Sequence, residues 1–346
     1  MLQRHSSTAH SAYADLRRSL LDERATEIRG TPVRVERNGR RYWYDNYRVG
    51  AEVKRRYIGE ETEALLETLT RHRALRAERD ERRRKRTRLV RLLRNEGYLN
   101  VDPATGSLLN ALASAGVFRL GGTLVGTNAF RLYEGELGVR MALDDAAMTN
   151  DLDIASFERL SLALAADDGV DPKMEDVLGE FQFAPAPSLE RGKTWRWRQT
   201  RSETFVEFLT PSFDDEEGLR ELPALGVSAQ SLHFLNYLIA EPIQAVALYR
   251  SGVLVQAPRP ERYAIQKLIV SERRRDGIDS LKSEKDRRQA AFLIDILAED
   301  RPDELAEALE DARSQGLRGR GAKWREKIDA ALKRMPETAA KLAALG

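Results

Sequence analysis

Three acidic residues carry the clearest chemical signal in this sequence. Asp151 and Asp153 are separated by one leucine in MTNDLDIASF, and Glu207 interrupts the apolar run ETFVEFLTP. Alternate residues of a strand point to the same face, so the two aspartates should share a face, and Glu207 should join them if the strands are neighbours. Adjacent carboxylates repel each other unless a cation lies between them, and hard divalent cations prefer such oxygen ligands. The trio predicts a metal site. The alternatives are two solvent-facing aspartates at a strand end and an outward-facing glutamate on an edge strand.

A double glycine is the second chemical feature. In FRLGGTLVGTNAF we predict a strand that ends at Leu120, a turn at Gly121-Gly122 and a helix that begins near Thr123. Glycines at such a turn let the backbone approach a ligand closely, and a helix N-terminus offers free N–H groups to a phosphate. Gly-Gly turns are common, so this pattern gains weight only beside the carboxylates.

Composition restricts the cofactor and the class of protein. The chain has 346 residues, 57 Lys and Arg against 55 Asp and Glu, no Cys and four His. Disulfides, zinc-thiolate sites and thiol catalysis are excluded, and any metal must be held by oxygen ligands. No run of about 18 apolar residues exists, which predicts no membrane-spanning helix. The N-terminus lacks the apolar core of a secretory signal, so we expect a cytoplasmic protein.

The elements that would position these residues follow from short apolar runs between helix-like stretches. We expect strands at 117–120, 152–155, 195–199, 205–209, 245–249 and 254–256. From about 260 onward Ala, Leu, Glu, Lys and Arg dominate, which predicts helices, and another helix is expected over 103–115 after the capping residue Asp102.

The N-terminal part has a different pattern. A helix over 12–29 is followed by two or three antiparallel strands over 32–58, in which Asn38-Gly39 marks a hairpin turn. Aromatic residues and arginines alternate in these strands. This pattern fits a small sheet with one solvated face, or a surface that stacks bases and binds phosphates.

A strongly basic helix should come next. Residues 61–96 contain no Gly or Pro, and 71–94 contain 12 Lys and Arg against 3 Asp and Glu. This imbalance favours binding to a nucleic-acid backbone, and the candidates are Arg82, Arg83, Arg84, Lys85 and Arg86. The alternatives are a basic face docked on acidic protein surface and a solvated helix.

Together, Gly121-Gly122, Asp151-Leu152-Asp153 and Glu207 resemble the active-site pattern of the DNA polymerase β-like nucleotidyltransferase superfamily. The longer segments YWYDNYRVGAEVKRRYIG, LGGTLVGTNAF, TNDLDIA, VEFLTP, RYAIQKLIVSERR and KSEKDRRQAAFLI look like an uncharacterised bacterial group with this fold. The chain is similar, more distantly, to nucleotidyltransferase toxins of abortive-infection type. It departs from the superfamily pattern in a long interval of 28 residues, 123–150, and in having Glu207 where Asp is commoner.

The resemblance implies an α+β fold. A polymerase β-type nucleotidyltransferase core, a mixed sheet with flanking helices, would lie between an N-terminal β-hairpin with its long basic helix and a C-terminal helical bundle. The corresponding domains are 1–100, 101–258 and 259–346.

The resemblance also implies a reaction, the transfer of NMP from an NTP to an acceptor hydroxyl, with tRNA or another RNA as acceptor. Asp151, Asp153 and Glu207 would hold two Mg²⁺ ions, with Mn²⁺ as the alternative metal. The NTP would be bound by Gly121, Gly122, Thr123, Lys267, Arg273, Lys285 and Asp286. For the residues on the later helices the alternative is an ion-paired helix surface. The alternative functions are a toxin with the same chemistry, neutralised by an antitoxin, and a non-catalytic nucleic-acid-binding protein.

Overall fold

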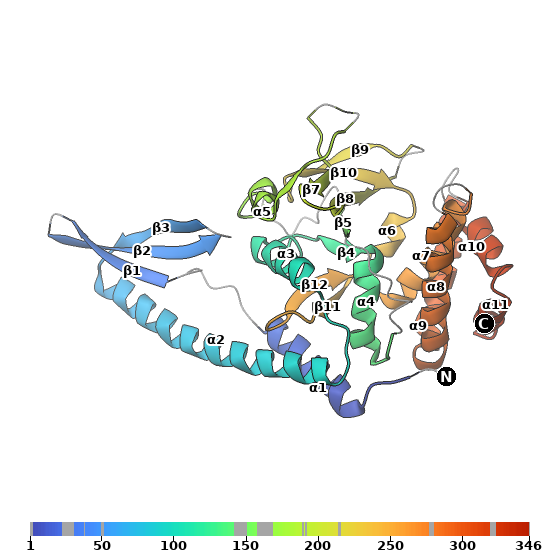
Figure 1. The fold of residues 1–346 in the computed structure, drawn as a ribbon, viewed down its shortest axis with the longest axis horizontal. Coiled ribbons are helices and arrows are strands. Elements are labelled where there is room, and N and C mark those ends of the chain that lie inside the picture. Colours follow the sequence, from blue (N-terminus) through green and yellow to red (C-terminus); the bar gives the residue numbers. More distant parts are fainter. Residues whose placement is uncertain are drawn as a thin grey trace.

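The central sheet of the protein mixes parallel and antiparallel strands (Figure 1). The computed structural model describes residues 3–22, 31–37, 39–49, 52–141, 151–157, 169–188, 190, 192–213, 216–276, 280–318 and 323–345. The strand order is β4 (Thr123–Val125), β5 (Leu152–Ala155), β8 (Phe205–Pro211), β10 (Val227–Leu232), β9 (Leu219–Leu222). Strand β8 is parallel to both β5 and β10, whereas β4 and β9 run antiparallel to their neighbours. A hairpin of β6 (Phe183–Pro185) and β7 (Arg196–Gln199) joins this sheet through β7, which pairs antiparallel with residues 205–207 of β8.

Helices and a small hairpin pack beside this sheet, and further helices form the C-terminal part of the chain. The elements beside the sheet are α3 (Pro103–Ala115), α4 (Gly126–Leu137), α5 (Met174–Glu180), α6 (Leu235–Leu238) and the hairpin β11 (Ile243–Ala247) with β12 (Val253–Ala257). Then follow α7 (Pro260–Arg273), α8 (Ser280–Asp300), α9 (Pro302–Arg318), α10 (Trp324–Leu332) and α11 (Pro336–Ala343). The expected α+β class, with a mixed sheet and flanking helices, is confirmed. Within the described ranges, no helix combines the length and apolar character needed to cross a bilayer.

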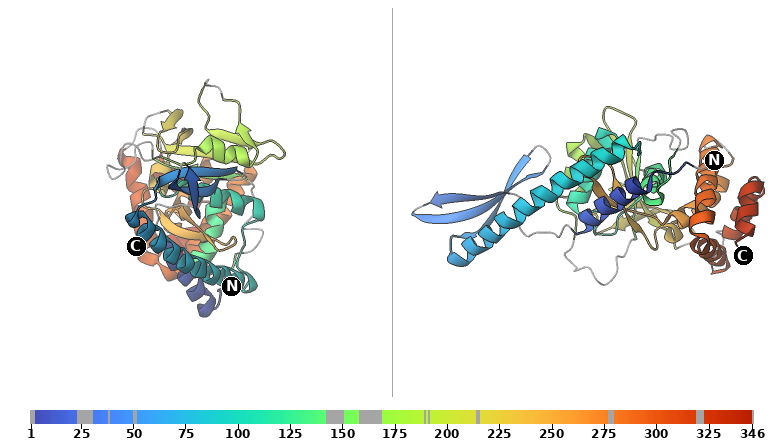
Figure 2. Two further views of the ribbon diagram at one scale, coloured as in Figure 1. Left: turned by 90° about the vertical axis from the view of Figure 1, so that its left-hand side faces the viewer. Right: turned by 90° about the horizontal axis from the view of Figure 1, so that it is seen from below.

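An arm, residues 31–95, projects from this core (Figures 1 and 2). It consists of the antiparallel sheet β1 (Thr31–Arg37), β2 (Arg40–Val49), β3 (Glu52–Glu60) and the long helix α2 (Glu63–Asn95). The sheet rests on the first turns of α2 through a small cluster of Trp43 and Leu69, which are buried, with Ile58 and Leu65 against them. Because this cluster is separate from the main core, the sheet is held mainly by α2.

The last turns of α2 attach the arm to the rest of the protein. Val90 and Leu93 are buried against α1 (Ser7–Leu21), in a cluster that also includes Leu248 next to β11. Helix α1 is capped by Ser6, whose hydroxyl accepts a hydrogen bond from the N–H of Ala9. Such capping satisfies a backbone donor that the helix itself leaves free.

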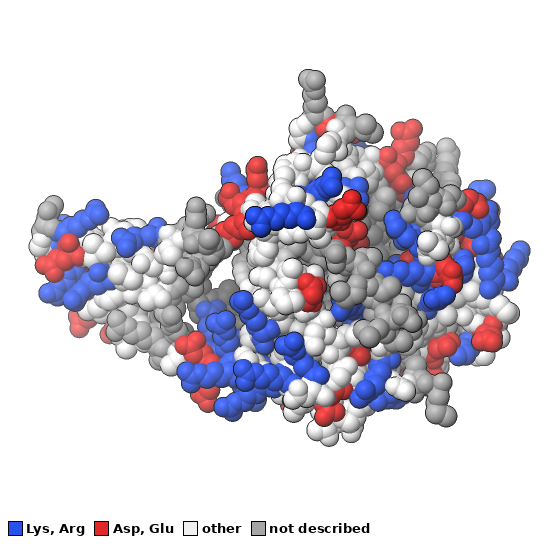
Figure 3. All heavy atoms as spheres, in the orientation of Figure 1, with Lys and Arg blue, Asp and Glu red and all other residues white. Residues whose placement is uncertain are grey.

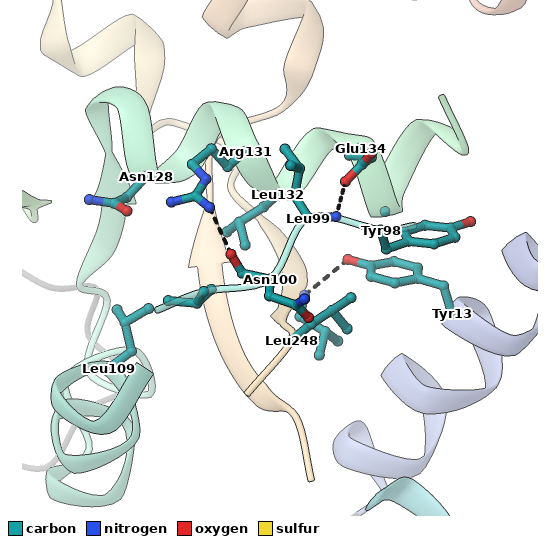
Figure 4. Close-up of a pocket in the computed structure, with 13 residues that line it drawn as sticks. Tyr13, Tyr98, Leu99, Asn100, Leu109, Asn128, Arg131, Leu132, Glu134 and Leu248 are labelled. Atoms are coloured by element: carbon teal, nitrogen blue, oxygen red, sulfur yellow. Dashed lines mark hydrogen bonds between the residues drawn. The ribbon is translucent and has the colours of Figure 1, made fainter. Parts of the chain in front are cut away.

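The segment after α2 is bonded to α4 around a small cavity of about 20 Å³, which has room for about one water molecule (Figure 4). Glu134 accepts a hydrogen bond from the N–H of Leu99 at 2.5 Å, and Arg131 donates to the carbonyl of Asn100 at 2.7 Å. Tyr13 of α1 accepts a hydrogen bond from the N–H of Val246. The segment that follows the arm is therefore joined to α4 by polar bonds, and α1, against which the last turns of α2 pack, is joined to β11.

The sequence placed most elements correctly but misplaced one strand. Residues 117–120 form a turn, and the strand is the three-residue β4 that follows it. A strand this short shows no alternation to detect. The strands β6, β9 and β10 were not expected. The expected helix over 12–29 is observed from Ser7 to Leu21, and 23–30 lie outside the described residues, as does Asn38 of the predicted hairpin turn.

Candidate active site

Neighbouring parallel strands bring the three acidic residues together. Asp153 of β5 and Glu207 of β8 are directly paired across the two strands. Asp151 lies just before β5, and its carboxylate accepts a hydrogen bond from the N–H of Phe205 at 3.0 Å. The amide of Asn128 donates to the carbonyl of Asp151 at 2.6 Å, which fixes the start of β5 against α4.

The electrostatics of these carboxylates reflect burial and mutual repulsion. The pKa of Asp153 is raised to about 7, first by burial and then by the negative charges of Glu207 and Asp151. Burial also raises the pKa of Glu207, and the guanidinium of Arg196 partly offsets this, with its Nε 2.7 Å from Oε1 of Glu207. The three carboxylates thus place negative charge in a buried region, where ionisation is unfavourable. A cation bound between them would lower the free-energy cost of ionising them.

Gly126 is the glycine that meets the carboxylates. It lies at the junction of β4 and α4 with φ +67°, and a Cβ there would be 2.2 Å from Oδ2 of Asp153. Only glycine permits this approach. No side chain caps the N-terminus of α4, so N–H groups of its first turn remain available beside Asp153.

The predicted phosphate-binding turn was therefore wrong in position. Gly121 and Gly122 lie at the opposite end of β4, in the turn before it. A Cβ at Gly122 would lie 2.6 Å from the side chain of Val117, so this glycine serves close packing within the turn. Thr123 is 1% exposed and its hydroxyl accepts a hydrogen bond from Gln256, so it does not face a ligand.

One face of α7 forms a cationic wall opposite Asp153. Tyr263, Lys267, Val270 and Arg274 follow helical spacing and line the same cavity as Gly126. The hydroxyl of Tyr263 donates to the carbonyl of Gly126 at 2.8 Å, which joins α7 to α4. This wall therefore faces the N-terminus of α4 at close range.

A buried aspartate of α8 orients two of these cations. Asp286 accepts from Nζ of Lys267 at 2.5 Å and from Arg274 at 2.9 Å, and its own side chain is 2% exposed. Asp286 does not line the cavity, so it positions the cations and does not contact a ligand there. Lys285 is also absent from the lining, and burial beside Lys267 lowers its pKa.

The cavity between these walls has a volume of about 290 Å³. Its polar side is formed by Gly126, Asp153 and the cationic wall of α7. Its apolar side is formed by Leu209, Leu232, Leu235 and Leu238. A cavity with one charged and one apolar side suits a ligand that has an anionic part and a flat organic part.

Arg273 borders the cavity but is already paired. It donates to both carboxylate oxygens of Glu217, at 2.8 and 2.9 Å, and its guanidinium lies over the ring of Phe234. Glu217 also approaches Nδ1 of His233, another lining residue, at 3.2 Å. Arg273 therefore shapes this rim, with its charge balanced by Glu217.

The donor set of the site fits a hard cation in type, because Asp151, Asp153 and Glu207 offer only oxygen ligands. Within the described ranges, no three Asp, Glu or His side chains are grouped closely enough to hold a metal as they stand. Asp151 is engaged by a backbone N–H and Glu207 by Arg196. Metal binding by all three therefore requires Glu207 to exchange its arginine for the cation.

The basic candidates on α2 divide into exposed and buried residues. Arg83, Arg84 and Lys85 are exposed, and Arg82 is partly exposed and pairs with Glu78 at 2.8 Å. Arg86 is 3% exposed and donates to the carbonyl of Ser19. The expectation that Arg86 contacts nucleic acid is wrong, because this side chain fastens α2 to α1. Figure 3 shows basic side chains gathered along the visible side of α2.

Sequence reasoning missed Gly126, Gln266 and Arg274. A signal existed for Arg274, which follows Lys267 by seven residues and so lies on the same face of the helix, and for Gln266, which lies four residues before Val270. Gly126 stood four residues beyond the more conspicuous double glycine, in Val-Gly-Thr rather than Gly-Gly.

Comparison with known proteins shows two family models that match parts of this chain. A family model described as a nucleotidyltransferase matches residues 103–314, more than half of the chain, from the start of α3 into α9. A second model, described as a domain of unknown function, matches residues 11–68, which include most of α1 and the sheet of the arm. Searches of the curated proteins and of the solved structures gave no match.

Proposed function

Because this chain belongs to a nucleotidyltransferase family, we propose that it transfers NMP from an NTP to the hydroxyl of an acceptor, with Mg²⁺ as the metal and RNA as the acceptor. The observation that carries the proposal is the cavity itself. It places Asp153 and the open N-terminus of α4 opposite Lys267 and Arg274. This is the charge distribution that a metal-bound triphosphate requires.

In this proposal the triphosphate lies against α7 and α4. Lys267 and Arg274, oriented by Asp286, bind the β- and γ-phosphates through charge-assisted hydrogen bonds. Free N–H groups at the start of α4 bind a further phosphate oxygen. The leucines of the apolar side cover the nucleobase.

The carboxylates act at the α-phosphate. Asp151, Asp153 and Glu207 would hold the Mg²⁺, which would supply charge neutralisation and lower the pKa of the acceptor hydroxyl. Glu207, whose pKa is raised by burial, takes the hydroxyl proton. The acceptor oxygen bonds to the α-phosphorus as the bond to the bridging oxygen breaks, and pyrophosphate leaves.

The test uses the full chain with Mg²⁺, each α-labelled NTP in turn, and total cellular RNA. We expect label to enter RNA with at least one NTP, and Asp153→Asn to lower the rate by about 10³-fold or more. Asp295→Asn is the matched control, because Asp295 is exposed and pairs with Lys341 on the surface.

If the label appears in protein instead of RNA, the acceptor is a protein and the proposed transfer reaction stands. RNA binding with no transfer from any of the four NTPs, unchanged in Asp153→Asn, would overturn the proposal in favour of a non-catalytic nucleic-acid-binding protein. Growth arrest on expression, relieved when the product of a neighbouring gene is co-expressed, would identify the protein as a toxin and that product as its antitoxin.

A further inference from the structure

The sheet of the arm has two unlike faces. Trp43 and Ile58 point to α2 and pack on Leu65 and Leu69. The alternation of β2 and β3 therefore directs Tyr42, Tyr44 and Tyr57 to the opposite face. Tyr57 is 54% exposed, and Val53, four positions earlier on the same face of β3, is 63% exposed.

The tyrosines of this outer face form a cluster. The ring of Tyr57 lies 5.5 Å from that of Tyr44, its cross-strand partner, and 6.3 Å from that of Tyr42. Tyr57 is exposed, and Tyr42 and Tyr44 are half-buried. A contiguous aromatic face of this kind on a protein surface indicates a binding site. Planar rings held in this way offer stacking surfaces.

Cations accompany the rings. The guanidinium of Arg55 lies 5.6 Å from the centre of the Tyr44 ring, and its Nε donates to Asn46 at 3.0 Å. Within the described part of the chain, Arg55 has no acidic partner. The same holds for Arg83, Arg84 and Lys85, which lie further along α2 and not on this face. Anionic groups spaced along a chain would balance these charges.

We propose that the outer face of the arm sheet binds single-stranded RNA, with bases stacked on Tyr42, Tyr44 and Tyr57 and a phosphate bound by Arg55. Stacking on separate rings requires bases that are not already stacked in a duplex, which selects the single strand. The choice of RNA rests on the proposed function, whereas the binding site rests on the face itself.

The experiment measures binding of the full chain, without NTP or Mg²⁺, to a fluorescein-labelled 12-nucleotide RNA by anisotropy. We expect Tyr57→Ala to weaken binding by about 5- to 150-fold, the usual effect of losing one stacked base. Tyr57→Phe keeps the ring and should restore the affinity. Phe213→Ala removes an aromatic residue that is 73% exposed on the core, and should leave binding unchanged.

Salt dependence tests the cation separately. Arg55→Gln should reduce the slope of log affinity against log salt by about 0.7, the value for one phosphate of a single strand, and Arg55→Lys should keep the slope. Tyr57→Ala should lower affinity with the slope unchanged. The different responses of affinity and salt slope in these two variants distinguish loss of stacking from loss of a phosphate contact, and both from a general loss of folding.

Equal affinity for the same RNA annealed to its complement would overturn the proposal, as would wild-type affinity in Tyr57→Ala. A dimer that Tyr57→Ala converts to a monomer would assign the face to a second copy of the chain. Failure here is separable from failure of the reaction, because Asp153→Asn should bind this RNA as the wild type does and transfer nothing to it.

Discussion

Asp153 shows how the site is built at the cost of stability. Its carboxyl pKa is raised from an ordinary value near 4 to about 7 in the folded chain. Between these values the unfolded chain releases the proton and the folded chain retains it. Stability is therefore lost as pH rises from about 4 to 7, and the full loss persists above 7.

Asp153→Asn should consequently stabilise the protein at pH 8, by roughly 1–3 kcal/mol, with little gain at pH 4. Urea denaturation of both proteins at the two pH values measures this, with Asp295→Asn as the exposed control. Mg²⁺ should raise the midpoint of the wild type at pH 8 and that of Asp153→Asn much less. Equal midpoints for all three proteins at pH 8 would contradict the burial of this charge.

Gly126 gives a second prediction at the residue scale. Gly126→Ala places a methyl group against Oδ2 of Asp153 at a positive φ, so it should lower kcat strongly and destabilise by about 1–3 kcal/mol. Gly179→Ala is the control, because its Cβ would meet no atom within 4 Å and it lies in helix α5. It should be neutral or stabilise by about 0.5–1 kcal/mol.

Among the elements, α7 contributes most to ligand binding in this proposal. Lys267→Gln removes one cation and leaves Asp286 paired with Arg274. The KM for the NTP should rise about 10- to 100-fold with a smaller change in kcat, because the interaction exists before the reaction begins. Steady-state kinetics check this.

The control for this variant is Lys341→Gln, which breaks a surface pair with Asp295 and should leave the KM unchanged. A fall in kcat alone, at constant KM, would place Lys267 at the reacting phosphorus instead of the distal phosphates.

The elements also show what the sequence could predict. The strands that carry Asp153 and Glu207 have strong apolar patterns and were located, and α3 was found from its Asp-Pro cap. Their pairing, β5 beside β8, depends on contacts between segments distant in the sequence. The sequence therefore predicted that the carboxylates meet only on the condition that these strands are neighbours. The cation Arg86 was included among the nucleic-acid-binding candidates although it is buried, because a count of charges does not say which face of a helix packs.

At the scale of the whole molecule, the arm and the cavity are separate sites on one chain. Helix α2 has 33 residues and is therefore roughly 50 Å long. A single strand that keeps the spacing of stacked nucleotides, about 3.4 Å each, covers that length with roughly 15 nucleotides. An RNA that has to cover a distance on the scale of α2 therefore needs up to about this length.

Transfer to RNA should therefore rise steeply as the acceptor is lengthened past roughly 15 nucleotides, because only longer chains bind at both sites. Tyr57→Ala should remove this increase and leave the rate on shorter acceptors unchanged. A series of acceptors from 6 to about 30 nucleotides, compared at equal concentration, measures the effect. A rate that is independent of length in both proteins would show that the arm does not present the acceptor.

The attachment of α2 at one end has a mechanical consequence. A long helix held by its last turns behaves as a lever, so a small tilt where Val90 and Leu93 meet α1 sweeps the distant sheet through a wide arc. The end of an RNA strand bound to that sheet would then reach a range of positions over the cavity while the RNA stays bound. The natural absence of cysteine makes this sweep directly observable, since thiols introduced at one site on the sheet and one on the core would be the only points of attachment for a pair of fluorescent dyes.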